Sequence, residues 1–140
     1  MNNLVYEFLG FHLVHIVYDF EQDEKVTQIR LGLKSINYDK GKNVLTLFPY
    51  IQIDGERNKN NSFEYVAGFV INDEEIRAAF IKEENETIEA FLPIFYASLF
   101  PFIRENIFSI TKDTPNSIKL PTVDCRQFNL NKDLVLTPTE

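Results

Sequence analysis

A run of apolar residues with helical spacing, interrupted by two prolines, constrains the fold of this chain more than any other feature. Within Thr87–Lys112 the apolar positions recur every three or four residues, at Ile88, Phe91, Leu92, Phe95, Leu99, Phe102, Ile103, Ile107 and Ile110. A proline inside a helix removes one backbone donor and clashes with the preceding turn. We therefore expect two helices, a short one with Pro93 in its first turn and a longer one from Pro101 to about Thr111.

The residues before this run alternate in the manner of β-strands. Four strands are expected, joined by a polar turn and a polar loop, over residues 4–20, 26–38, 44–53 and 63–71. Pro49 is expected at a sheet edge or at a bulge, because it cannot donate a hydrogen bond to a neighbouring strand. Residues 72–86 fit either a helix or an extension of the sheet, and this alternative stays open.

These elements predict the α+β class: a four-stranded antiparallel meander followed by a short and a long helix packed on one face. The 140 residues suit a single domain, since a chain of this length can bury one sizeable core. The expected parts are a sheet region over about 4–81, helices over 87–112, and an extended loop with a polar tail over 113–140.

The first expected strand is apolar on both faces. Its apolar residues occupy one phase at Leu4, Tyr6 and Phe8 and the other at Phe11, Leu13 and Val17. Gly10, between the two groups, is a candidate bulge at which the phase changes. A strand that is apolar on both faces needs cover on both faces, so this pattern favours a neighbouring subunit.

Composition and charge exclude several classes of partner. The net charge is −7 and the pI is about 4.9, so nucleic acids and anionic membranes, which attract basic surfaces, are not expected as partners. The acidic runs Glu21–Glu24 and Asp73–Glu75 are interpreted as solvated faces. Thirteen phenylalanines and six tyrosines fit either a Phe-rich core or a surface for a partner.

The sequence also bears on the compartment. The single cysteine, Cys125, excludes an intrachain disulfide and suits a reducing environment. The first residues lack the features of a signal peptide, and no apolar run is judged long enough to cross a membrane. A cytoplasmic location without membrane insertion is therefore expected.

No catalytic constellation is recognised in the sequence. His12 and His15, the two histidines, are expected on opposite faces of a regular strand, where they could not share a metal ion. Ser98, Ser109 and Cys125 lack the neighbours of a nucleophile motif, and the glycines are too scattered for a phosphate-binding loop. No metal or cofactor is expected. A small α+β enzyme is thus a weaker hypothesis than a binding protein.

The string Leu99-Phe100-Pro101-Phe102-Ile103-Arg104-Glu105, followed by Leu120-Pro121 and then Val123-Asp124, resembles the SecB protein-export chaperone family. That family has a similar segment at the start of its long helix, after four antiparallel strands. The resemblance implies a tetramer, built as a dimer of dimers, in which sheets continue between subunits and long helices pack at an interface. It also implies that unfolded or presecretory polypeptides bind in hydrophobic grooves without nucleotide, with the translocation motor ATPase as a further partner.

Two sets of residues are assigned on this basis. The polypeptide-binding groove is predicted at Phe48, Tyr50, Phe69, Phe95, Tyr96 and Phe100. The oligomer interface is predicted at Phe11, Leu13, Val17, Phe102, Arg104 and Ile107. For Arg104, pairing with a carboxylate at an interface or lying across the helix face is favoured over a role as a ligand anchor.

One difference from the family leads us to consider two alternative functions. The closing amphipathic helix of the classical chaperone corresponds here to a short polar stretch, Asn129–Lys132, that leads into Thr137-Pro138. The main prediction is a holdase for non-native or presecretory polypeptides. The alternative is a SecB-like scaffold dedicated to one protein partner, such as an antitoxin, a phage protein or a host factor.

Overall fold

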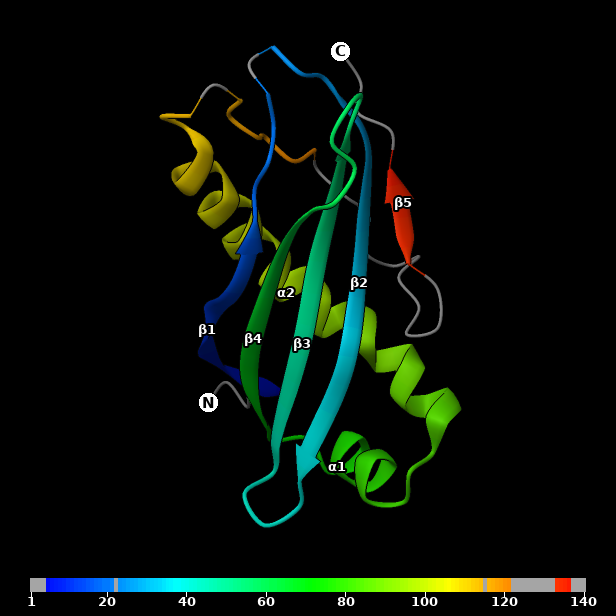
Figure 1. The fold of residues 1–140 in the computed structure, drawn as a ribbon. Coiled ribbons are helices and arrows are strands. Elements are labelled where there is room, and N and C mark those ends of the chain that lie inside the picture. The colour runs from blue at the N-terminus through cyan, green and yellow to red at the C-terminus, as the bar shows by residue number, and fades with distance from the viewer. Residues whose placement is uncertain (1–4, 22, 115, 122–132, 137–140) are drawn as a thin grey trace.

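The computed structural model describes residues 5–21, 23–114, 116–121 and 133–136, which form an antiparallel sheet with a long helix across one face (Figure 1). In chain order the elements are β1 (Tyr6–Val17), β2 (Val26–Asp39), β3 (Val44–Gly55), β4 (Asn61–Ile71), α1 (Glu74–Ile81), α2 (Asn85–Thr111) and β5 (Leu134–Leu136). The predicted α+β class, with four main antiparallel strands and two helices, is confirmed.

The strands lie in the order β1-β4-β3-β2-β5, and each neighbouring pair is antiparallel. β2, β3 and β4 follow one another through short connections, as a meander predicts. β1 departs from that pattern, because it pairs with β4 and not with β2. β5, which comes from the predicted polar tail, pairs with β2 at the other end of the sheet.

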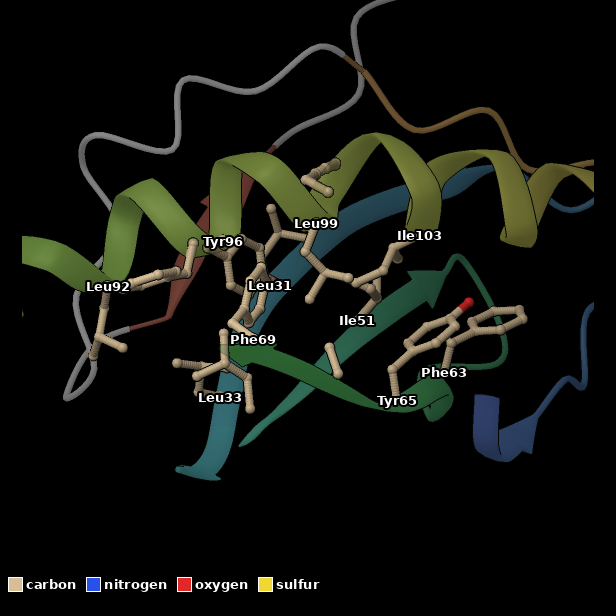
Figure 2. Close-up of a cluster of buried hydrophobic side chains, with 14 of the residues drawn as sticks. Leu31, Leu33, Ile51, Phe63, Tyr65, Phe69, Leu92, Tyr96, Leu99 and Ile103 are labelled. Carbon is tan, nitrogen blue, oxygen red and sulfur yellow. The ribbon is translucent and has the colours of Figure 1, made fainter. Parts of the chain in front are cut away.

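The core lies between the sheet and α2. β3 and β4 alternate strictly between buried and half-buried residues, so one face of each strand points towards the helix. Figure 2 shows fully buried side chains from the two layers meeting there: Leu31, Ile51 and Phe69 from the strands, and Tyr96, Leu99 and Ile103 from α2. Burying one large apolar side chain contributes about 1.5–3 kcal/mol, so this contact accounts for the docking of α2.

α2 is a single helix of 27 residues, and the predicted division into two helices at Pro101 was wrong. Pro93 and Pro101 both lie inside it, the first half-buried and the second exposed. A proline in a helix interior costs about 3 kcal/mol, because a backbone hydrogen bond is lost and the ring crowds the preceding turn. Burial of residues such as Leu92 and Ile103 against the sheet offsets this cost and keeps the helix continuous.

α2 also has the length and apolar composition of a membrane-crossing helix, contrary to the expectation that no apolar run is long enough. That criterion is weak, since it concerns length and composition alone and the core helix of a folded protein also meets it. The buried positions of α2 are Ile88, Leu92, Phe95, Tyr96, Leu99, Phe100, Ile103, Ile107 and Thr111. Packing of this face on the sheet explains much of the apolar character of the helix.

Residues 72–86, for which the sequence allowed either a helix or an extension of the sheet, contain the helix α1. Asp73 caps this helix, since its Oδ1 accepts a hydrogen bond from the backbone N–H of Ile76 at 3.0 Å. Glu74 and Glu75 lie in the first turn, where negative charge is favourable to the helix dipole. Phe80 then stacks on Tyr38 of β2, with ring centroids 4.8 Å apart. The helical alternative is therefore correct.

Gly10 forms the predicted bulge in β1. The register with β4 shifts between Phe8 and Gly10, and the φ of Gly10 is +133°, a value that side chains strongly disfavour. Phe8 pairs with Phe69 and Phe11 pairs with Ala67. Phe69 and Ala67 are both buried. The bulge therefore places Phe8 and Phe11 on the same, helix-facing side, where an unbroken strand would separate them.

A second shift in β1, between Leu13 and His15, changes the relation between the two histidines. His12 pairs with Val66 and His15 with Glu64, which lie on the outer face of β4. The expectation of opposite faces was wrong, because the extra residue restores the phase. Both histidines are exposed, and no group of three or more potential metal ligands occurs in the part of the chain that the structure describes.

Pro49 lies in β3, an interior strand, so the edge position considered for it was wrong. It pairs with Leu33 of β2, directly before the register of β2 and β3 shifts. The missing donor of Pro49 thus falls next to an interruption of the hydrogen-bond ladder. The bulge alternative agrees with this position.

Candidate functional site

The six residues predicted to line a groove do not form one surface. Four of them are at most 5% exposed and lie between the sheet and α2: Phe69, Phe95, Tyr96 and Phe100. Phe48 and Tyr50 lie on the outer face of β3, away from the helix, and are half-buried. The structure thus places four members of the set in the core of the subunit and two on the far side of the sheet.

Exposed and half-buried apolar side chains gather instead along β1 and the adjacent part of α2. We call this set the β1 patch, and its members are Phe8, Leu9, Phe11, Val14, Ile16, Val17 and Phe102. Phe102 of α2 connects the helix to the strand, because its ring lies 5.2 Å from that of Phe8 and 5.9 Å from that of Phe11. Leu9, Val14 and Phe102 expose 56%, 57% and 48% of their surface.

The backbone of β1 is available for hydrogen bonding along one side, because β1 lies at the edge of the described sheet. β4 pairs with one side of this strand, and no strand among the described residues pairs with the other. A twelve-residue edge strand without proline offers unpaired N–H and C=O groups to another chain. Apolar side chains beside such an edge are typical of a protein-interaction site.

The structure divides the predicted interface residues. Four of them lie on β1 or in the β1 patch: Phe11, Leu13, Val17 and Phe102. Ile107 is fully buried, so it belongs to the core. Arg104 lies elsewhere on α2, where it lines a hollow of about 240 Å³ together with Lys119 and Leu120. An interface role for the first four stays a prediction.

The outer face of the sheet has a polar hollow of about 500 Å³. Its lining residues are Lys34, Tyr50, Gln52, Asn60, Ser62 and Glu64. Lys34 forms an ion pair with Glu64, and His15 Nδ1 lies 3.7 Å from Glu64 Oε2. This lining suits polar contacts and does not match the apolar groove predicted from the sequence.

Tyr50, on the outer face of the sheet, joins β3 to the residue that precedes β5. Its hydroxyl donates a hydrogen bond to Asp133 Oδ2 at 2.5 Å. Burial and this hydrogen bond raise the pKa of Tyr50 to about 12, so the hydroxyl remains a donor at neutral pH. Gly32 pairs with Tyr50, and a Cβ at Gly32 would overlap both the Tyr50 ring and the Asp133 carboxylate.

Glu24 is a buried carboxylate, 4% exposed, within an acidic run that was predicted to be a solvated face, so for this residue the prediction was wrong. Its Oε2 accepts hydrogen bonds from the backbone N–H groups of Arg57 and Asn58, each at 2.7 Å. Burial by itself would raise the pKa of Glu24, but these and further hydrogen bonds from Glu21 and the Asn58 amide lower it to about 2. The carboxylate therefore fixes the β3–β4 loop and is not placed for acid–base chemistry.

Comparison with solved structures shows a likeness in fold. No protein-family model matches the sequence, and no curated protein matches it. The solved structure of Rv1957, a SecB-like chaperone from Mycobacterium tuberculosis in complex with a ChAD peptide from the Rv1956 HigA1 antitoxin, matches with a TM-score of 0.52. The match covers 84% of this chain and 90% of that chain at 14% sequence identity. The fold is SecB-like.

The SecB-like fold confirms the resemblance inferred from the sequence. The motif that suggested it, Leu99–Glu105, lies on α2 and supplies both buried residues and the exposed Phe102. The second part of that motif, Val123-Asp124, lies outside the described residues, as do Cys125 and the polar stretch Asn129–Lys132. The strand that the tail adds to the SecB-like sheet was not predicted. The signal for this strand in the sequence was the weak apolar pair Leu134 and Leu136.

Proposed function

We propose that this chain is a SecB-like chaperone dedicated to one protein partner, which it binds as an extended or unfolded segment. The observation that carries this proposal is the likeness, over 84% of the chain, to a SecB-like chaperone in complex with an antitoxin peptide. Because the identity is 14%, the likeness concerns the fold, and the assignment of a partner is our inference. A poorly folded protein such as an antitoxin is the class of partner that fits best, and the cytoplasm is the place of action that we propose.

We also propose that two copies assemble through the β1 patch. A long edge strand with exposed apolar residues favours association with another strand, so a stable protein must cover it. Antiparallel pairing of β1 with the same strand of a second copy would use one surface twice, which is how two-fold dimers close. This contact would cover Leu9, Val14 and Phe102, the most exposed members of the patch.

A general holdase for unfolded or presecretory chains is the second candidate function. The exposed apolar side chains of the β1 patch favour it, since a holdase must offer such surface. One buried apolar side chain contributes about 1.5–3 kcal/mol before ordering costs, so a holdase must engage several sites at once. Delivery of clients to the translocation motor ATPase would belong to this second function.

The two candidates differ in the breadth of their clients. The first measurement is light scattering during the aggregation of three unrelated denatured enzymes, with and without the purified chain at equal concentration. The second is fluorescence anisotropy with labelled peptides from antitoxins and from preproteins. We expect little suppression of general aggregation and tight binding to a narrow set of peptides. Suppression of all three aggregation reactions would support the general holdase, and failure in both assays would refute the chaperone assignment.

A further inference from the structure

β5 adds a short strand to the edge of β2 that faces away from β3. Its three residues pair antiparallel with β2, with Leu136 opposite Ile29, Val135 opposite Arg30 and Leu134 opposite Leu31. Figure 1 shows this strand beside β2, at the end of the sheet opposite to β1. The chain thus demonstrates on itself that this edge accepts an extended peptide.

The side chains of β5 alternate in their environment, so the edge has a definite preference. Leu134 and Leu136 are half-buried and pack against the hydrophobic core, opposite the buried residues Leu31 and Ile29. Val135 is 47% exposed. A peptide on this edge therefore needs apolar residues at the first and third positions and tolerates a polar residue at the second.

The residue before the strand makes a polar contact of its own. Asp133 accepts the hydrogen bond from Tyr50, and the missing side chain of Gly32 provides the space in which these two groups meet. A hydrogen bond to a carboxylate is stronger than one between neutral groups. The edge thus selects an acidic residue directly before the apolar–x–apolar triplet.

β5 occupies little of the edge available to it. β2 contains 14 residues, and β5 pairs with the three from Ile29 to Leu31. Between Gly32 and Asp39, no strand among the described residues pairs with this side of β2. A longer extended segment could therefore form more backbone hydrogen bonds with β2 than β5 does.

We propose that Ile29–Leu31 forms a strand-addition site for a partner segment of the pattern acid–apolar–x–apolar, and that β5 occupies this site as a displaceable internal ligand. The proposal rests on the proposed function, because it identifies where the bound polypeptide pairs. Since β5 is tethered, its effective concentration is on the order of millimolar, and a partner segment must exceed that competition. Release of β5 therefore raises the apparent affinity for the partner.

The test uses a labelled peptide with the sequence of residues 131–138, NKDLVLTP, added to the full chain. Its binding is measured by fluorescence anisotropy to the unaltered chain and to the variant Leu134→Ser/Leu136→Ser, in which β5 is weakened. We expect the variant to bind the peptide at least tenfold more tightly than the unaltered chain. Equal affinity for the two chains, or no binding to either, would overturn the proposal.

Matched peptides test the register. Exchange of the second triplet residue, the equivalent of Val135, for lysine should leave binding to the variant within about twofold, because that position is exposed. Exchange of the first, the equivalent of Leu134, should abolish it. Exchange of the aspartate for alanine should weaken it about tenfold, as expected for a hydrogen bond to a charged group. Binding that is indifferent to these exchanges would exclude the proposed register.

A second variant keeps the test valid if the double substitution impairs folding, which circular dichroism would reveal. Asp133→Ala removes the contact with Tyr50 from the tethered strand alone, and it should strengthen binding of the added peptide in the same direction by a smaller factor. The aggregation and anisotropy assays of the proposed function do not depend on this peptide. A chain that binds antitoxin peptides but not NKDLVLTP would therefore refute the strand-addition site and leave the chaperone function intact.

Discussion

Phe8 of β1 and Phe102 of α2 stack at the open side of the fold, with ring centroids 5.2 Å apart and ring planes 29° from parallel. Phe8 is half-buried, whereas Phe102 exposes 48% of its surface. The pair therefore joins the edge strand and the helix into one apolar surface. A second polypeptide can cover this surface and pair with the backbone of β1 at the same time.

Charge in the β1 patch should prevent self-assembly. Phe102→Asp places a carboxylate beside Phe8 and Phe11, where a subunit contact would have to desolvate it. We expect this variant to have the mass of one subunit by light scattering coupled to size-exclusion chromatography, while the unaltered chain forms a dimer or larger assembly. Ile81→Asp is the matched control, since Ile81 is 45% exposed on α1, and it should assemble normally. Identical masses for all three chains would contradict a role for the patch.

Two apolar residues of α2 should differ sharply in their contribution to stability. Leu99 is fully buried, so Leu99→Ala should lower the free energy of unfolding by about 2–5 kcal/mol. Phe102 is half-exposed, so Phe102→Ala should cost less than about 1.5 kcal/mol when the chain is diluted until it is monomeric. Urea unfolding followed by circular dichroism measures both values. A larger loss for Phe102 than for Leu99 would show that the helix face is assigned incorrectly.

The lowered pKa of Glu24 should make the free energy of unfolding depend on pH in the acid range. Its pKa is lowered in the folded chain to about 2 from an ordinary value of 4.5, so its contribution is fully present above pH 4.5. That contribution should decline as the pH falls from 4.5 to 2, because the unfolded chain takes up the proton first. Glu24→Gln should be less stable at pH 7 and should lose less stability over this acid range. The midpoint of urea unfolding between pH 7 and pH 2.5 checks this, and parallel curves for both chains would contradict it.

The bulge at Gly10 should make this glycine hard to replace. Its φ of +133° is strained for any residue with a side chain, so Gly10→Ala should cost about 1–3 kcal/mol although the space around it is empty. Gly68 of β4 is the matched control. A Cβ there would make an ordinary contact of 3.6 Å with Leu9, and the backbone is not in a disfavoured region, so Gly68→Ala should be close to neutral. Thermal unfolding of both variants measures the difference, and equal losses would argue against the bulge.

Much of the fold could be predicted from local patterns. The period of two in the first seventy residues located all four main strands, and Gly10 indicated the bulge because few residues other than glycine adopt its conformation. The place of β1 could not be predicted. A strand that is apolar on both faces gives no preference between β2 and β4 as a neighbour. The continuous α2 could not be predicted either, since packing against the sheet overrides the local effect of Pro101.

The candidate site was harder to predict for a physical reason. Phe95 and Phe102 are seven residues apart and therefore share one stripe of the helix. Phe95 is buried against Tyr6 and Phe69, whereas Phe102 lies at the open side next to β1. The periodicity that both residues share cannot distinguish them. Their difference comes from how α2 crosses the sheet, which is decided by tertiary packing.

The unequal ends of the sheet limit how copies of this protein can join. A molecule with two bare strand edges could attach β1 of one copy to β2 of the next, and such head-to-tail addition continues into fibres unless a ring closes. β5 covers Ile29–Leu31 at the second edge. The short strand thus makes β1 the more open of the two ends, which favours pairing between two copies of β1, a contact that finishes the assembly, over addition of β1 to β2, which would extend it.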